Sequence, residues 1–249
     1  MNFYANFNYN RNQMTKLWEK DLKQASMGDG TSMYYVVGKP FGEFYMQEWR
    51  GVNPETGEPQ WTAADGGITT DYDEAVEVDL GKSVLAPYSG GFGLNVSWKG
   101  IGLLADFAWV VGNYMCNNNL YFAANTYFGG NYGQVDEVLD YWKKPGDRTK
   151  YPALYYETQF DSRMIEEASF LRLKNIQLSY TLPSQLLRKT KFIKGLKVYV
   201  GARNLLTVTG YNGFDPEVAG GDLTGDIGAF DADVYPNSRQ WTFGCEFTF

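Results

Sequence analysis

The sequence RQWTFGCEFTF, residues Arg239–Phe249, decides the fold. Its apolar residues recur at every second position, and they are Trp241, Phe243, Cys245, Phe247 and Phe249. A period of two predicts a β-strand and excludes an amphipathic helix. Strands of outer-membrane barrels alternate lipid-facing apolar residues with lumen-facing polar ones, and strands of soluble sandwiches alternate as well. The aromatic end without a polar tail favours the barrel, because the ends of soluble chains usually fray.

Residues 91–112 predict a hairpin of two strands joined by a two-residue turn at Lys99-Gly100. In this register the apolar residues oppose each other in four pairs, which are Trp98 with Ile101, Val96 with Leu103, Leu94 with Ala105, and Phe92 with Phe107. Opposed residues share one face of a sheet, so all eight apolar side chains fall together. Asp106 falls on the other face with Gly102 and is therefore expected to face the lumen of a barrel.

Long and short connections alternate after residue 91. The segments Asn113–Glu167 and Thr207–Ser238 are rich in Asn, Gly and Pro and predict long loops, whereas Lys99-Gly100 and Pro183–Gly195 predict shorter turns. Between them, strands are expected over Phe170–Leu182 and Leu196–Leu206. The apolar phase changes near Lys174-Asn175, which indicates either a β-bulge or the rim of a membrane. Barrels of the outer membrane have long loops on one side and short turns on the other.

The first 90 residues are less regular. Glu43–Arg50 predicts a strand and Gly51–Gly67, with its Pro and Gly residues, predicts a loop. The pattern does not determine on which side of a membrane these connections lie. Residues 1–10 already alternate through Phe3, Ala5, Phe7 and Tyr9, and no basic or apolar leader precedes them. We therefore expect the chain to be the C-terminal part of a longer protein, with roughly eight barrel strands.

Composition excludes several classes of function. The net charge of −7 and the pI of about 4.8 argue against a nucleic-acid partner. Histidine is absent, which removes Ser-His and Cys-His catalytic pairs and imidazole metal sites. Aromatic residues make up 17% of the chain, which suits an interfacial aromatic girdle or a carbohydrate-binding surface. Cys116 and Cys245 form no disulfide framework, and Cys245 is expected to be a buried free thiol.

Several segments taken together resemble the C-terminal region of SusC/RagA-family TonB-dependent transporters. In chain order these segments are GKPFG with FY at 38–45, GVNPETG at 51–57, PYSGGF at 87–92, ASFLRLKNI with LSYTLP at 168–183, VYV at 198–200, RNLLT at 203–207, GFDPEV at 213–218 and YP at 235–236. They cover most of the chain, and the set is far more specific than any one segment.

The resemblance implies an all-β fold: the C-terminal strands of a plugged barrel of roughly 22 antiparallel transmembrane strands, with long extracellular loops. Residues 1–249 would be one such part, without plug, TonB box or signal peptide. It also implies uptake of oligosaccharides, or in some members peptides, across the Gram-negative outer membrane. The implied partners are a SusD-like surface lipoprotein, TonB acting through the N-terminal part, the barrel assembly machinery and the lipid bilayer. The assembly machinery would recognise the aromatic terminal strand, with Trp241, Phe243, Phe247 and Phe249.

Six aromatic residues are expected to be exposed on loops or at the lumen rim, and they are Trp61, Tyr88, Tyr127, Trp142, Tyr151 and Tyr211. Ligand contact and packing within the loops are equally compatible with their positions. Asp222, Asp226, Asp231 and Asp233 could bind calcium, although their spacing is not that of an EF-hand and a solvated loop is the preferred interpretation. Glu166 and Glu167 are adjacent and would face opposite ways in a strand.

Two other functions remain open. A soluble, aromatic-rich carbohydrate-binding β-sandwich would also explain the alternation, and it would dissolve without detergent. An outer-membrane hydrolase would need a nucleophile and a base other than histidine. No catalytic residue, cofactor or metal ligand is predicted, so we expect a transporter and not an enzyme.

Overall fold

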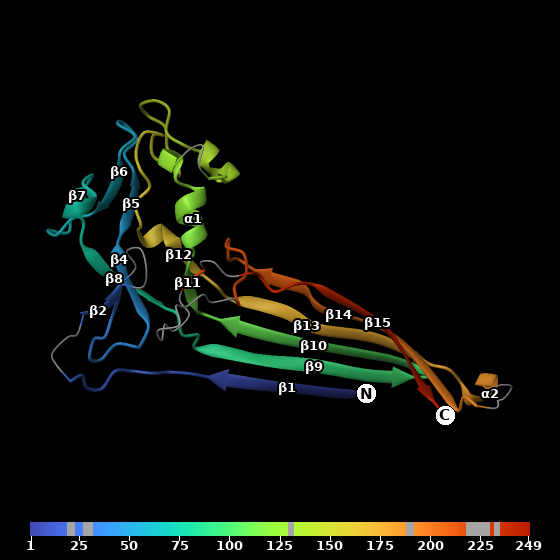
Figure 1. Ribbon diagram of the computed structural model, residues 1–249. Helices are drawn as coiled ribbons and strands as arrows, with labels where there is room; N and C mark the ends of the chain where they lie inside the picture. Colours follow the sequence, from blue (N-terminus) through green and yellow to red (C-terminus); the bar gives the residue numbers. More distant parts are fainter. Residues whose placement is uncertain (19–22, 27–31, 129–131, 188–191, 218–229, 232–234) are drawn as a thin grey trace.

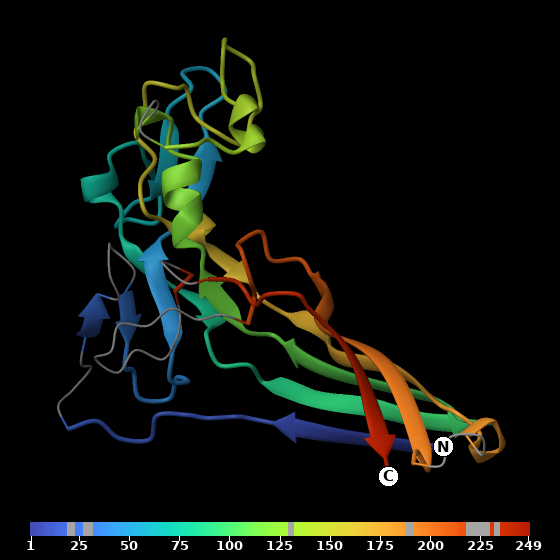
Figure 2. The same cartoon turned by 45° about the vertical axis from the view of Figure 1, so that its right-hand side comes forward.

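The computed structural model describes residues 1–18, 23–26, 32–128, 132–187, 192–217, 230–231 and 235–249. It has two parts, a long curved sheet and a layer of loops and small sheets that stands at one end of it (Figure 1). Both ends of the chain lie at the opposite end of the long sheet, and the view in Figure 2 shows the same arrangement.

The long sheet, called the barrel sheet below, contains six antiparallel strands in the order β1-β9-β10-β13-β14-β15. Their bounds are Asn2–Tyr9, Tyr88–Trp98, Ile101–Val111, Phe170–Thr181, Gly195–Thr209 and Gln240–Thr248. The sheet confirms the prediction of a partial, unclosed barrel. The expected number of about eight barrel strands was too high, because the segments between β1 and β9 form small separate sheets.

The β9–β10 hairpin has the register expected from the alternation. Trp98 opposes Ile101, and the pairing continues without a shift to Tyr88 and Val111. Lys99 and Gly100 both have positive φ angles, 47° and 89°, as a type I′ turn requires. The turn twists in the same sense as the strands that it joins, so the pairing register is kept along the hairpin.

A β-bulge at Lys174 interrupts β13. Asp106 pairs with Asn175 and Phe107 pairs with Leu173, so Lys174 is the extra residue. This confirms the bulge interpretation of the phase change. Because one residue is inserted, Leu171 and Leu173 return to the face that carries the apolar residues of β10.

The order of connections also agrees with the sequence pattern. Residues 10–87, 112–169 and 210–239 connect strands at the loop-layer end, and the hairpin turn and residues 182–194 connect them at the other end. The pairing of β1 with β9 determines on which side the first 90 residues lie: the strands described between Tyr9 and Tyr88 belong to the loop layer. The second turn contains the short helix α2, Ser184–Leu187, and residues 188–191 lie outside the described part of the chain.

The loop layer is built from small elements. Its strands are β2 (Lys23–Ser26), β3 (Ser32–Tyr34), β4 (Glu43–Gln47), β5 (Trp49–Val52), β6 (Pro59–Thr62), β7 (Ile68–Thr69), β8 (Glu77–Ser83), β11 (Tyr114–Cys116) and β12 (Ile165–Glu167). The helix α1 covers Asn118–Ala123, and 3-10 turns cover Tyr72–Glu74 (η1), Thr126–Phe128 (η2), Asp136–Leu139 (η3) and Ser162–Met164 (η4). Within the described residues, every helix is too short or too polar to cross a membrane.

The prediction that residues 51–67 and 113–167 are loops was only partly right. Residues 51–67 are not only a loop, because β5 and β6 pair across the Pro- and Gly-rich stretch and Trp49 opposes Trp61. The segment 113–167 contains α1, three 3-10 turns and the β11–β12 pair. Composition marks the turns correctly, but tertiary pairing of the residues between the turns builds strands that composition alone did not indicate.

The buried core lies in the loop layer. Phe44, Met46 and Cys116 are fully buried there and pack with Phe160, Met164 and Ile165. The barrel sheet is the reverse, since Phe243 is 77% exposed and Trp98 is 64% exposed. A sandwich requires a second sheet over its apolar face, so this exposure excludes the sandwich alternative. Cys245 shares that face and is exposed, so the expectation of a buried thiol was wrong.

Candidate functional site

The barrel sheet has one apolar and one polar face. Asp106 lies on the polar face, as the hairpin register predicted. Its carboxylate accepts hydrogen bonds from the Tyr4 hydroxyl and from the Asn175 side chain, the latter over 3.2 Å. The Tyr4 ring covers Gly93, where a Cβ atom would collide with it. Three strands are thus joined by side chains across the polar face.

The terminal strand shows the other face. Trp241 opposes Ala202, Phe243 opposes Val200 and Phe247 opposes Leu196, all on one side. Trp241, Phe243, Phe247 and Phe249 are all exposed. Recognition of this strand by an assembly machinery stays a prediction.

An ion cluster fastens the segment after β14 to the polar face. The buried Arg172 guanidinium in β13 donates to Asp215 Oδ1, and its Nη1 lies 2.8 Å from Glu217 Oε2. Lys174 in the bulge also pairs with Glu217. Asp215 further accepts from the backbone N–H groups of Glu217 and Asn237, over 3.0 and 2.9 Å. We call this cluster the Arg172 clamp; it holds residues 211–217 against the sheet.

Acidification is expected to loosen this segment. Burial alone would raise the pKa of Asp215, but the hydrogen bond from Arg172 and the two backbone N–H groups outweigh burial and lower it. A lowered pKa in the folded state means that the clamp contributes full stability above the ordinary value of 3.8 and loses it as pH falls through the lower folded value. Hydrogen-exchange protection of the Glu217 amide, which donates to Asp215, should fall over that range after correction for intrinsic rates. Asp215→Asn should show low protection and no such pH step; an unchanged step in this variant would contradict the assignment.

Asp231 organises the other side of the same segment. Its buried carboxylate accepts from the Tyr211 hydroxyl over 2.8 Å and from the Phe214 N–H over 3.1 Å. Burial raises the pKa of Asp231, and burial together with the Asp231 charge raises the pKa of Tyr211. Asp231 is therefore a structural acceptor. The other members of the possible calcium cluster, Asp222, Asp226 and Asp233, lie outside the described residues. Within the described part, no group of three acidic or cysteine residues is placed to share a metal ion.

Gly213 is the point of closest approach in this segment, and alanine is expected to destabilise it. A Cβ atom at Gly213 would overlap both Asp231 Oδ2 and the Tyr211 ring. Overpacking of this kind typically costs about 1–3 kcal/mol. Gly210→Ala is the matched control, because no atom lies within 4 Å of its added Cβ. Local opening free energies from hydrogen exchange would test the pair, and equal values for both variants would contradict the close approach.

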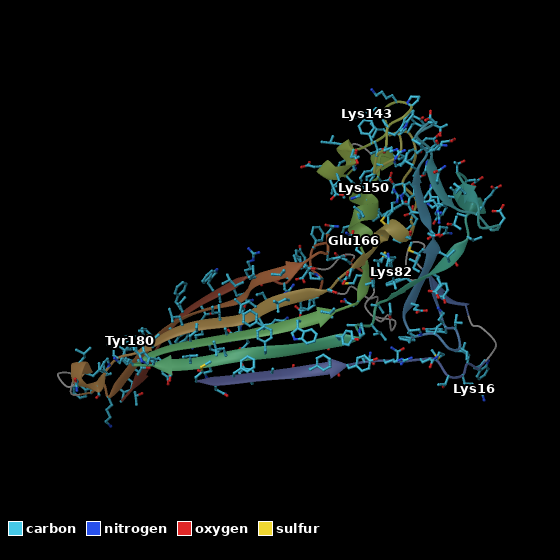
Figure 3. The ribbon with its side chains drawn as sticks, turned by 180° about the vertical axis from the view of Figure 1, so that it is seen from behind. Lys16, Lys82, Lys143, Lys150, Glu166 and Tyr180 are labelled. Atoms are coloured by element: carbon cyan, nitrogen blue, oxygen red, sulfur yellow. The ribbon has the colours of Figure 1, made fainter. Side chains whose placement is uncertain are left out.

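The junction between the loop layer and the barrel sheet is polar. Glu166 in β12 accepts from the Asn117 side chain over 3.1 Å and from the Asn212 N–H over 3.0 Å. Glu167 accepts from Ser169 instead, so the two adjacent carboxylates have separate partners. Lys82 donates to the Ile165 carbonyl over 3.1 Å, and burial lowers its pKa. Figure 3 labels Lys82 and Glu166 near this junction and Lys150 farther out in the loop layer.

Three of the six aromatic residues proposed for ligand contact are buried, which corrects the expectation that they are exposed. Trp61, Tyr151 and Tyr211 are 2%, 4% and 6% exposed. The Trp61 indole N–H donates to Asp161 over 2.9 Å, and Tyr151 belongs to a core cluster of the loop layer. Each of the three rings is buried among residues of the loop layer or of the segment after β14, so packing explains these three.

The other three occupy different surroundings. Tyr88 begins β9 and contacts Tyr9 in a tilted arrangement with ring centroids 5.4 Å apart, so it lies on the barrel sheet and not on a loop. Trp142 is half-buried and donates to the Pro54 carbonyl over 2.8 Å. Tyr127 is 65% exposed in η2. Ligand contact by Tyr127 and Trp142 stays a prediction.

A cavity of about 170 Å³ lies between α1, η3 and the segment after β14. We call it the α1 cavity. Leu120, Ala123 and Val135 form its aliphatic wall, and Phe214 adds an aromatic side chain. Glu137, Lys150, Glu166, Asn117, Asn119 and Asn212 supply its polar groups. Neither the α1 cavity nor the Arg172 clamp is predicted by the sequence pattern. The local signal for the clamp is an arginine within the apolar alternation of β13.

Comparison with known proteins gives consistent results. No protein-family model matches the chain. TonB-dependent receptor P3 of Formosa agariphila is 27% identical over 98% of this chain and 26% of its own length. TonB-dependent receptor SusC of Bacteroides thetaiotaomicron is 37% identical over 34% of this chain and 8% of its own length. The structure of the RagAB peptide importer in the open-open state superposes with a TM-score of 0.83, with 41% identity over 99% of this chain and 26% of that chain. The chain thus spans about a quarter of the length of P3 and of the RagAB chain.

Proposed function

The chain belongs to the SusC/RagA family of TonB-dependent transporters, and from this premise we propose that it forms part of the barrel wall of an importer in the Gram-negative outer membrane. Residues 1–249 would act as one unit, with the barrel sheet in the membrane and the loop layer outside the cell. The lumen would lie on the polar face, where Asp106 and Arg172 are found.

The observation that carries this proposal is the contrast between the two faces of the barrel sheet. Exposed Phe3, Trp98, Val208 and Phe243 all lie on one face. Soluble proteins rarely expose an apolar surface of this extent, whereas a barrel in lipid needs it. On the opposite face, charged and amide side chains form hydrogen bonds across strands, as expected for a face that lines the water-filled lumen of a barrel.

We propose peptides as the imported substrate, in preference to oligosaccharides. The support is the likeness to the RagAB peptide importer, which includes the loop layer, since it covers 99% of this chain. Oligosaccharides are the alternative, and the exposed ring of Tyr127 favours them as a platform for a sugar.

The proposed partners follow from the family. A SusD-like surface lipoprotein would close over the loop layer, and TonB would supply energy through a plug enclosed by the complete barrel. The barrel assembly machinery would recognise β15. The relatives bear the names of receptors and importers, so we propose transport without a catalytic step, and the net charge of −7 disfavours nucleic acid.

Uptake by the complete transporter, expressed with its partner lipoprotein, tests this function. Cells should accumulate a labelled peptide pool when TonB is present and lose this uptake when TonB is deleted. A parallel assay with labelled oligosaccharides distinguishes the two substrates. TonB-dependent uptake of oligosaccharides alone would replace the peptide proposal, and uptake of neither would refute the importer itself.

A further inference from the structure

We propose that the α1 cavity is a binding site for one aliphatic side chain of the imported peptide. The inference rests on the peptide substrate proposed above and assigns part of its recognition to named residues.

The aliphatic wall is held in place by local hydrogen bonds. The Asn117 side chain caps α1 by accepting from the Leu120 N–H over 3.1 Å, and the Val135 N–H donates to the Ala123 carbonyl over 3.0 Å. Leu120, Ala123 and Val135 therefore form a wall that does not depend on a ligand. Phe214 is 67% exposed, although its own N–H is bound to Asp231.

The three charged groups that line the cavity all have partners. Lys150 pairs with Glu137, and Glu166 accepts from Asn117 and Asn212. A buried uncompensated charge would attract an ion of opposite sign. Among the described lining residues, Lys150 and Glu137 neutralise each other and Glu166 is hydrogen-bonded by neutral groups, so the remaining hydrogen-bonding capacity of these groups suits the neutral amides of a peptide backbone. Figure 3 labels both residues, Glu166 near the junction with the barrel sheet and Lys150 farther out in the loop layer.

Size and chemistry select the side chain. An apolar cavity of about 150 Å³ can hold a benzene-sized group, and the α1 cavity measures about 170 Å³. One Leu, Ile, Val or Met side chain fits this volume. A sugar ring would place hydroxyl groups against Leu120, Ala123 and Val135, where they would lose their hydrogen bonds to water without replacement.

The rest of the peptide has a path along the polar face. The segment that carries Phe214 continues to Glu217, which is tied to Arg172 on that face. Glu217 lines a second depression, open to the polar face, together with Asn6 and Asn8 of β1. A peptide anchored in the α1 cavity would therefore extend over the Arg172 clamp toward the inner wall. There Asn6 accepts from the Gly91 N–H over 2.5 Å and Asn8 donates to Ser89 over 3.4 Å, and a side-chain amide can form more than one hydrogen bond.

Selection from a random peptide pool tests the cavity. The complete transporter with its partner lipoprotein is incubated with decapeptides randomised at every position, and retained peptides are sequenced. Ala123→Leu fills the cavity with a residue that suits a helix. Ala64→Leu adds the same side chain in a turn that does not line the cavity. Both variants are first checked for heat-modifiable migration, which reports a folded barrel.

Wild-type protein should enrich aliphatic residues at one peptide position. Ala123→Leu should lower affinity for these peptides roughly tenfold or more and remove the enrichment, while Ala64→Leu keeps it. As a second variant, Leu120→Ala should shift the preference toward larger side chains. Enrichment that persists in folded Ala123→Leu protein, or a wild-type pool without aliphatic enrichment, would overturn the assignment of the cavity alone. Retention of no peptide at all would overturn the proposed peptide import, and the cavity assignment with it.

Discussion

Replacing Arg172 by methionine is expected to raise the opening probability of residues 211–217 by several orders of magnitude. Arg172 and Asp215 are both buried, with side chains 3% and 5% exposed. Removing one partner of a buried ion pair leaves the other charge without compensation, which costs about 3–5 kcal/mol. Asp215 would then keep only its two backbone donors. The segment should detach from the polar face, and Phe214 should leave the wall of the α1 cavity.

Hydrogen exchange of the Phe214 and Glu217 amides measures this opening. Lys174→Met is the matched control, because Lys174 pairs with the same Glu217 but is 34% exposed, and exposed pairs contribute about 0–1 kcal/mol. Arg172→Met combined with Asp215→Leu should recover much of the protection, since no uncompensated carboxylate remains at that position. If Lys174→Met proves as damaging as Arg172→Met, the clamp does not depend on buried charge.

Phe243→Arg is expected to destabilise the folded barrel by about 2–4 kcal/mol, the cost of a cationic side chain at the midplane of the lipid-facing surface. Phe243 opposes Val200 in the middle of β15 and is 77% exposed. Its neighbour Thr242 opposes Gly201 on the polar face. Thr242→Arg should therefore cost much less, because its side chain would enter the lumen.

Refolding of the complete transporter into lipid vesicles, followed by denaturant titration, provides the two free energies of unfolding. The two variants introduce the same arginine at neighbouring positions, so the added charge is equal and only the face of the sheet differs. Their comparison isolates which face meets lipid. Equal costs would refute the assignment of faces, and a higher cost for Thr242→Arg would reverse it.

The barrel strands after residue 88 were predictable because their signals are local. Alternation identifies each strand, and the Lys99-Gly100 turn determines the β9–β10 register from neighbouring residues alone. The change of apolar phase near Lys174 indicated either a β-bulge or a membrane rim. The structure contains the β-bulge. Asp106 followed from the same register. The alternation between long and short connections indicates a barrel without any tertiary information.

The residues that build the candidate site depend on contacts between distant segments. Arg172 and Asp215 are 43 positions apart, and the α1 cavity combines a helix, a 3-10 turn, β12 and the segment after β14. Trp61 was expected on an exposed loop, yet it is buried because Trp49, Tyr72 and Asp161 surround it. No local period encodes such neighbours.

The amino-acid sequence by itself determined that Arg239–Phe249 is a strand with one aromatic face. Side chains in a strand point alternately to two sides, so the residue types at every second position determine whether a face is apolar or polar. Only the tertiary structure decided what each face meets. Pairing with β14 places Trp241, Phe243 and Phe247 on an exposed apolar surface, and folding of the distant loops over the polar face creates the clamp and the cavity. These contacts arise when segments far apart in the chain are brought together, which depends on the packing of the whole molecule.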